Sequence, residues 1–231
     1  MSGSKTGIGA GAALLLLIAG CDPGATLDRD LIPAEEGPSM MPPRLMKEAR
    51  KLYLWYADGS APPAGSICRG TPPPYSCTFG ASLEECKAKV QVWLDRWYAG
   101  FDVEFTTAKP TGGPHHVVVV TSSGDWCDQD PSVAGIAPFR CGGLEGATAY
   151  ALTCGDDAKA CAVIIAQEQG HLMGLEHTEN PNDVMNAEVC SDCDGFANRP
   201  SAVMAGRCGR NTQNSHGMVM QRLGGRISDS P

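Results

Sequence analysis

The stretch Ala160–Met185, ACAVIIAQEQGHLMGLEHTENPNDVM, decides how the rest of the chain is interpreted. Its first half is a proline-free apolar run, and Asp156-Asp157 just before it is typical of a helix N-terminus. Gly174 follows the run, at a position typical of the residue after a helix, where the backbone turns left-handed. The sequence therefore predicts a long helix that ends near Met173 and is followed by a sharp turn.

Polar residues gather at the end of this predicted helix. Gln167 and His171 are four positions apart, so on a helix they share a face. Glu168 lies beside them, and a turn at Gly174 can bring His177 back toward His171. Neutral imidazole is a common zinc ligand, and a nearby glutamate can take a proton from an attacking water. The alternative interpretation is structural, with two surface histidines near the negative end of a helix.

The segment QEQGHLMGLEH resembles the metzincin metalloprotease motif HExxHxxGxxH, which is followed by a turn containing methionine. Gln167 stands where the motif has its first histidine, and Met185 is placed as the methionine of the turn. The resemblance, closest to the matrixin-like group, implies a zinc endopeptidase with Glu168 as general base and protein or peptide substrates. The positions that match the motif are Glu168, His171, Gly174 and His177.

Gln167 leaves three interpretations of the site. In the first, its amide oxygen or a water completes a weaker but active zinc site, because an amide is a weaker ligand than imidazole. In the second, another side chain replaces the missing histidine. In the third, the site holds no metal and the domain is an inactive binding module. The candidate substitutes are His115, His116, His216, Glu176 and Asp183.

The N-terminus is typical of an export signal. Lys5 precedes the apolar run Ile8–Ile18, which is shorter than the roughly 20 residues that a membrane-spanning helix needs. Small residues then lead into Cys21, and this arrangement resembles the lipobox of bacterial lipoprotein precursors. The resemblance implies cleavage before Cys21 and lipidation of that cysteine. An ordinary secretory signal with a chance cysteine is the alternative.

These features predict three regions. Residues 1–20 are expected to be the signal peptide, and residues 21–46, rich in Pro, Gly and acidic residues, a flexible tether. Residues 47–231 are expected to form a metalloprotease-like domain. The protein would then be exported and held in the bacterial cell envelope, contacting the membrane only through its lipid. A formal charge of −8 without a basic run argues against nucleic acid as a partner.

The chain has eleven cysteines, and cysteines of an exported protein are in an oxidising environment. Without Cys21 an even set of ten remains, which predicts a disulfide framework. The sequence does not fix the pairing, although neighbours such as Cys77 with Cys86, or Cys154 with Cys161, are natural candidates. The ten candidates are Cys68, Cys77, Cys86, Cys127, Cys141, Cys154, Cys161, Cys190, Cys193 and Cys208.

The remaining pattern predicts an α+β or α/β domain in which two long helices back a mixed, twisted sheet. Ser82 and Glu85 form a capping-box pattern at the start of a first helix that extends to Tyr98. A loop-rich, disulfide-linked subdomain with a last short helix over 215–223 would follow the active-site helix. Strands are expected over 50–56, 101–107, 116–121 and 147–153, the last at an edge of the sheet.

Two further clusters have the composition of metal sites, but each also has a simpler structural interpretation. Asp125, Asp128 and Asp130 can bind calcium through oxygen, but a solvated acidic loop is the commoner arrangement. The CxxC segment 190–193, with Cys208 and His216, has the spacing of a second zinc site, but disulfides are the expected state of exported cysteines. His115 and His116, just before a buried strand, are expected at the surface.

Overall fold

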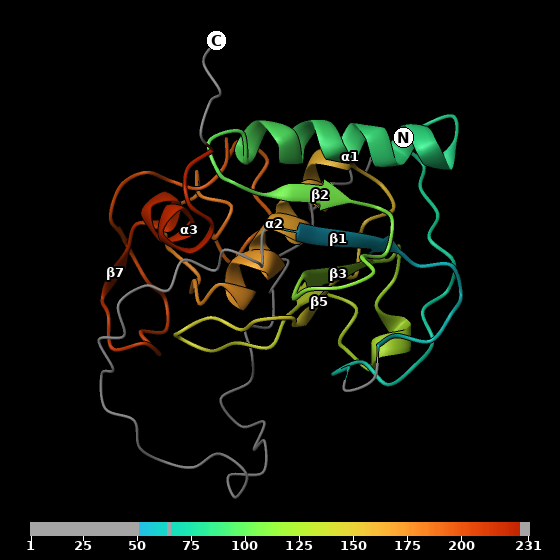
Figure 1. The fold of residues 1–231 in the computed structure, drawn as a ribbon, viewed down its shortest axis with the longest axis horizontal. Helices are drawn as coiled ribbons and strands as arrows, with labels where there is room; N and C mark the ends of the chain where they lie inside the picture. Colours follow the sequence, from blue (N-terminus) through green and yellow to red (C-terminus); the bar gives the residue numbers. More distant parts are fainter. Residues whose placement is uncertain (1–50, 64–65, 227–231) are drawn as a thin grey trace, which may run out of the picture.

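The computed structural model describes residues 51–63 and 66–226 (Figure 1). The predicted signal peptide, the tether and the lipidation candidate Cys21 lie outside these residues. Within the described ranges, no helix is both long and apolar enough to cross a membrane.

A five-stranded mixed sheet lies at the centre of the molecule. Its strands are β1 (Lys51–Tyr56), β2 (Glu104–Thr106), β3 (His116–Val120), β4 (Gly135–Ile136) and β5 (Thr148–Ala151). The order across the sheet is β2-β1-β3-β5-β4. The first four strands in this order are parallel to one another, and only β4 is antiparallel to its neighbour β5. Together with three helices, this sheet confirms the predicted mixed α+β class.

The helices begin and end close to the predicted positions because their caps are encoded locally. They are α1 (Leu83–Trp97), α2 (Ala158–Leu172) and α3 (Ser215–Leu223). The Ser82 side chain accepts the Glu85 amide hydrogen at 3.2 Å, as the capping pattern predicts, while the Glu85 carboxylate accepts from Ala81 at 2.8 Å. At the start of α2, the Asp157 side chain accepts from the Ala160 amide at 2.7 Å.

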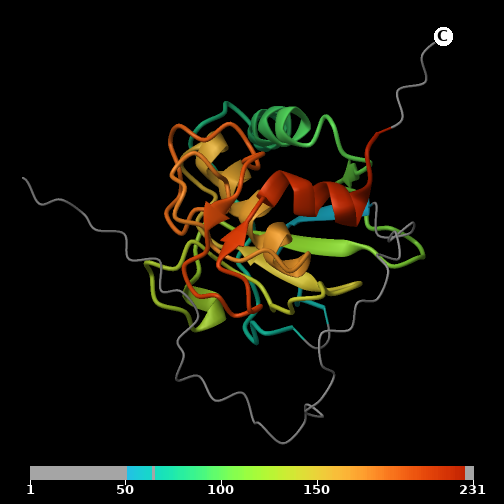
Figure 2. The same ribbon diagram turned by 90° about the vertical axis from the view of Figure 1, so that its left-hand side faces the viewer.

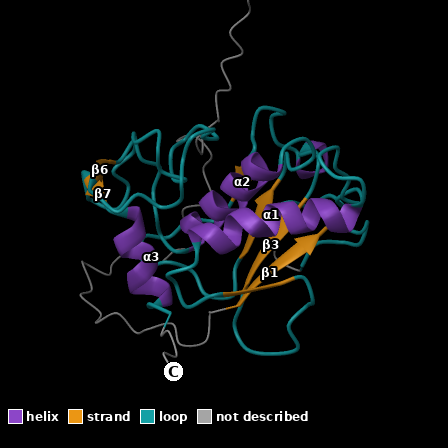
Figure 3. Ribbon diagram, turned by 90° about the horizontal axis from the view of Figure 1, so that it is seen from above, coloured by secondary structure: helices purple, strands orange, loops and turns teal. Residues whose placement is uncertain are grey.

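The sheet separates two apolar clusters. On one face, Leu54 and Val118 pack with α1 and α2, which lie next to each other (Figure 3). On the other face, Val119 and Tyr150 pack against loop residues, including the disulfide Cys68–Cys127. Buried on both faces, β3 is apolar at each position after its first, as the branched run HVVVV predicts.

Two predictions about the sheet are wrong. The strand β5 is not at an edge, because the two-residue strand β4 pairs with it on the side away from β3. So short a strand in a loop rich in Gly and Pro carries no periodic signal. His116 is also not at the surface: it is 1% exposed and its Nε2 donates to the Leu144 carbonyl at 2.7 Å.

All ten described cysteines form disulfides, as the even count predicts. The local pairs Cys77–Cys86 and Cys154–Cys161 confirm the suggested neighbours. Cys190 pairs with Cys193 and Cys208 pairs with Cys141, which excludes the CxxC zinc alternative in this state of the chain. The fifth pair, Cys68–Cys127, joins residues that are 59 positions apart.

The chain after α2 is rich in loops, as expected, and covers one end of α2 (Figure 2). Its regular elements are α3 and a small antiparallel pair, β6 (Ser201–Ala202) with β7 (Thr212–Gln213). The Cys141–Cys208 disulfide connects this tail covalently to the segment between β4 and β5.

Gly174 makes the reversal between α2 and the tail. Its φ of +86° lies in the left-handed region, which glycine adopts without steric cost. A Cβ atom at this position would lie 2.6 Å from the Cys141 carbonyl oxygen and 2.9 Å from that of Arg140. The position therefore requires glycine for two reasons, its backbone angle and the backbone packed against it.

Gly174→Ala is expected to lower the free energy of unfolding by about 3 kcal/mol or more, because strain and overlap add. Gly146→Ala is the matched control, since Gly146 has a φ of +62° with nothing near its absent Cβ. That variant should cost only about 1 kcal/mol. Urea unfolding of the oxidised proteins, followed by circular dichroism, measures both. If both variants lost the same free energy of unfolding, the backbone around Cys141 would have to move aside at little energetic cost.

Candidate functional site

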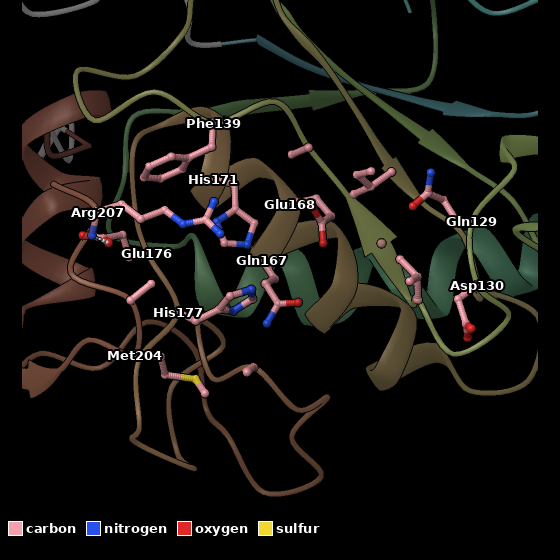
Figure 4. A pocket seen from close by; sticks show the side chains of 16 residues that line it. Gln129, Asp130, Phe139, Gln167, Glu168, His171, Glu176, His177, Met204 and Arg207 are labelled. Carbon is pink, nitrogen blue, oxygen red and sulfur yellow. Dashed lines mark hydrogen bonds between the residues drawn. The ribbon is translucent and has the colours of Figure 1, made fainter. Parts of the chain in front are cut away.

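The last turns of α2 carry three polar side chains into a cleft of about 370 Å³ (Figure 4). Gln167, Glu168 and His171 all line it. The helix around them is buried at every residue from Cys161 to Gly170, because the sheet, α1 and the tail surround it. These polar groups therefore project from an otherwise apolar element, which is a feature of functional sites.

The reversal at Gly174 brings His177 back beside His171. The two ring centroids are 4.5 Å apart and the rings are nearly perpendicular, at 79°. Both rings line the cleft, with Gln167 next to them (Figure 4). The structure thus brings together the two histidines and the glutamine that the sequence singled out.

The environment of the histidines favours neutral imidazole. Burial, followed by the neighbouring His177, lowers the pKa of His171 to about 3. Burial also lowers the pKa of His177. The Nδ1 of His171 donates to the Leu175 carbonyl at 2.8 Å, which fixes the tautomer and leaves Nε2 with its lone pair. This is the state in which a histidine binds a metal.

Gln167 is oriented by the turn that follows the histidines. Its side chain is 2% exposed, and its Nε2 donates to the Asn186 carbonyl. The amide oxygen is consequently the atom of Gln167 that can reach a cation. Among the described residues, no group of three His, Cys, Asp or Glu side chains is arranged to hold a metal. Two imidazoles and one amide oxygen fit zinc, but as a weaker donor set than three histidines.

Glu168 is a buried carboxyl group without a full set of partners. It is 3% exposed, and its Oε2 has no hydrogen-bond partner among the described residues. Burial raises the pKa of Glu168 to about 8. The edge strand β4 lies directly against it, since a Cβ on Gly135 would be 2.5 Å from Oε1. A polar group held in an apolar cleft in this way is available to a ligand.

Met185 packs beneath the end of α2. Its sulfur occupies the space that a Cβ on Gly170 would need. The turn around Met185 is held by Asp183, which is buried and accepts from the Met185 amide at 3.1 Å and from the Ser215 hydroxyl at 2.7 Å. Asp183 therefore supports the turn and is not directed at the histidines.

The other candidate substitutes for the missing histidine are engaged elsewhere. Glu176 lines the cleft, but its carboxylate pairs with the Arg210 guanidinium at 3.1 Å. The ring of His216 packs against Phe101, and that of His115 against Tyr53. His116 bonds to the Leu144 carbonyl. None of these lies with His171 and His177 as a third strong donor.

The calcium candidates stay a prediction. Asp125 begins a short 3-10 helix, Asp125–Cys127, and Asp128 follows it with a φ of +55°. Asp130 accepts from the Ser132 amide at 2.8 Å and from its hydroxyl at 2.6 Å. These bonds are those of an ordinary acidic turn.

Several cleft residues have no signal in the sequence. Phe139 and Arg207 face the histidines from two segments that are far apart in the chain, and Gln129 and Asp130 line the far end (Figure 4). The Cys141–Cys208 disulfide, whose pairing the sequence does not give, links the first two segments. Comparison with known proteins adds no relative, because no protein-family model and no curated protein matches this chain.

Glu168→Gln is expected to change the pH dependence of stability in chelator-treated protein. The pKa of Glu168 rises from 4.5 unfolded to about 8 folded, so the native state holds the extra proton between these values. Stability is then lost as pH rises from 4.5 to 8, by on the order of 5 kcal/mol. In the Glu168→Gln variant, the free energy of unfolding should not show this decrease with rising pH.

Urea unfolding between pH 5 and 9, with the wild type as reference, measures the difference. Glu188→Gln is the control, because Glu188 is exposed and should keep the wild-type pH dependence. A wild type and a Glu168→Gln variant with parallel profiles would contradict the raised pKa.

Proposed function

We propose that this chain is a metzincin-like zinc endopeptidase with a weakened metal site. The observation that carries the proposal is the convergence of His171 and His177 beside Gln167 and Glu168 in one cleft. Two features support it further. Met185 lies beneath the helix that carries the site, and an antiparallel edge strand, β4, lies against Glu168.

In this proposal His171, His177 and the Gln167 amide oxygen hold the zinc. A zinc ion in such a site supplies Lewis acidity toward water and toward a peptide carbonyl. Glu168 accepts the proton of the attacking water at its unpartnered oxygen and returns it to the leaving amine. A bound zinc ion would favour the carboxylate form of Glu168, which the role of general base requires.

The remaining residues of the cleft bind and orient the substrate. Ile136 and Phe139 offer apolar walls that exclude water from a bound peptide. Because an amide oxygen replaces one imidazole among the ligands, the chain is expected to bind zinc less tightly than a site with three histidines. The enzyme is proposed to work in the bacterial cell envelope, anchored by lipid on Cys21.

A second candidate function is a non-catalytic binding module on the same fold. The hydrogen bond from Gln167 to the Asn186 carbonyl favours it, because this bond ties the glutamine to the turn whether or not a metal is present. The same cleft would then hold a peptide without cutting it.

Metal content and peptide cleavage, measured together on three variants, separate these functions. Gln167→His is expected to tighten zinc binding roughly tenfold or more and to raise turnover, because it supplies an imidazole. Glu168→Ala should keep the zinc and lose cleavage by about a hundredfold. Gln167→Ala is the matched control and should bind zinc more weakly than the wild type.

Two results would contradict the proposed catalytic site. The peptidase proposal would be wrong if the protein without residues 1–21 took up no zinc under any folding condition. Cleavage that survives in Glu168→Ala would show a contaminating protease or a different catalytic residue. Cleavage that disappears in Glu168→Ala would exclude the binding-module alternative.

A further inference from the structure

One side chain of the tail holds the residue that precedes His177. Gln213, the last residue of β7, is 2% exposed, and its amide faces the backbone of Glu176. The Oε1 of Gln213 accepts from the Glu176 amide at 2.9 Å, and its Nε2 donates to the Glu176 carbonyl at 2.9 Å. A single side chain thus satisfies both backbone groups of a buried residue, as a neighbouring strand would.

The Glu176 carboxylate binds the same part of the tail. It accepts from the Arg207 backbone amide and from the Arg210 Nε, the latter at 3.1 Å. Figure 4 shows this carboxylate directed away from the rings of the two histidines. Both the backbone and the side chain of Glu176 are therefore held by the segment 207–213.

Gln213 also connects to the turn around Met185. Its Nε2 donates to the Ser215 hydroxyl at 3.1 Å. That hydroxyl donates to the Asp183 carboxylate at 2.7 Å, and the same carboxylate accepts from the Met185 amide at 3.1 Å. Ser215 and Asp183 are fully buried. The two hydrogens of the Gln213 amide each have an acceptor, so only one orientation of this amide satisfies all of its partners.

The contacts of Gln213 differ from the backbone bond beside His177. The His177 carbonyl accepts from the Met204 amide at 3.0 Å, and a bond of this kind is available to any sequence. Loss of the Gln213 amide would instead leave two buried backbone groups of Glu176 without a partner. That state is costly, so the chain just before His177 is expected to shift until these groups find other partners.

We propose that Gln213 is a positioning residue of the candidate metal site. It keeps the His177 ring against His171 by linking the loop before His177 to the turn around Met185. Gln213 does not line the cleft, so it acts through its neighbours rather than on metal or substrate. The inference rests on the proposed zinc site for its consequence, but the placement of the two rings can be measured without a metal.

Nuclear magnetic resonance on the oxidised, chelator-treated protein tests this placement directly. The ring centroids of His171 and His177 are 4.5 Å apart, close enough for a nuclear Overhauser cross-peak between ring protons. The wild type is expected to show this cross-peak, and Gln213→Met is expected to lose most of its intensity. Methionine is close to glutamine in size and shape, but it has no N–H donor and only a weak acceptor.

Three further variants separate positioning from a general loss of stability. Ser215→Ala should keep the bonds between Gln213 and Glu176 but break the link to the turn, so it should weaken the cross-peak partly. If Gln213→Met does not fold, an unchanged cross-peak in Ser215→Ala overturns the inference. Gln221→Met is the matched control, the same exchange at an exposed position of α3. Val219→Ala removes buried apolar volume from α3 and should lower stability without changing the cross-peak.

Metal binding measures the consequence for the proposed site. With cobalt(II) as the probe, the dissociation constant is expected to rise about tenfold in Gln213→Met, as it does when residues that orient metal ligands are replaced. The visible absorption of the bound cobalt(II) should also change, because it reports the coordination geometry. Gln221→Met and Val219→Ala should bind cobalt(II) as the wild type does.

A cross-peak that is unchanged in Gln213→Met, or absent from the wild type, would overturn the inference whatever the metal result. Equal losses in Gln213→Met and Val219→Ala would also overturn it, because they would show a purely structural effect. A cross-peak that depends on Gln213 in a protein that binds no metal would support the inference and remove the zinc peptidase. Peptide cleavage by a protein whose cobalt(II) affinity does not depend on Gln213 would do the reverse.

Discussion

The reversal of the chain at Gly174 is the constraint on which the cleft depends. The preceding helix can carry Gln167, Glu168 and His171 on its own, but it cannot supply a second imidazole at the same place. The left-handed turn, packed against the Cys141 carbonyl, sends the chain back so that the His177 ring meets that of His171. Any change that opens this turn separates the two rings, even if each residue keeps its own hydrogen bonds.

Local chemistry made much of the fold predictable. The capping residues Ser82 and Asp157 and the apolar periodicity give the helices to within a few residues. The disulfides Cys77–Cys86 and Cys154–Cys161 match guesses made from the short spacing of their cysteines, but spacing alone does not fix the connectivity. The strand β4 did not follow, because two residues are too few for a pattern, and its presence is also the reason that β5 is interior.

In the candidate site too, only the residues that lie close together in the sequence could be predicted. Residues on one helix and just after it are related by helical geometry, so Gln167, Glu168, His171 and His177 could be grouped from spacing. Phe139 and Arg207 come together only in the folded chain, through contacts between distant segments. The roles of Asp183 and Glu176 were also out of reach, because both acids are engaged by residues more than 30 positions later.

The Cys141–Cys208 disulfide joins the two walls of the cleft, one carrying Phe139 and the other Arg207. Closing a loop of 67 residues removes on the order of 4 kcal/mol of freedom from the unfolded chain. The width of the cleft is therefore set by a covalent bond that forms only under oxidising conditions. A chain folded without that oxidation keeps α2 and His171, but one wall of its cleft is no longer linked covalently to the other. The final shape of the cleft therefore depends on oxidation of Cys141 and Cys208 during maturation of the protein.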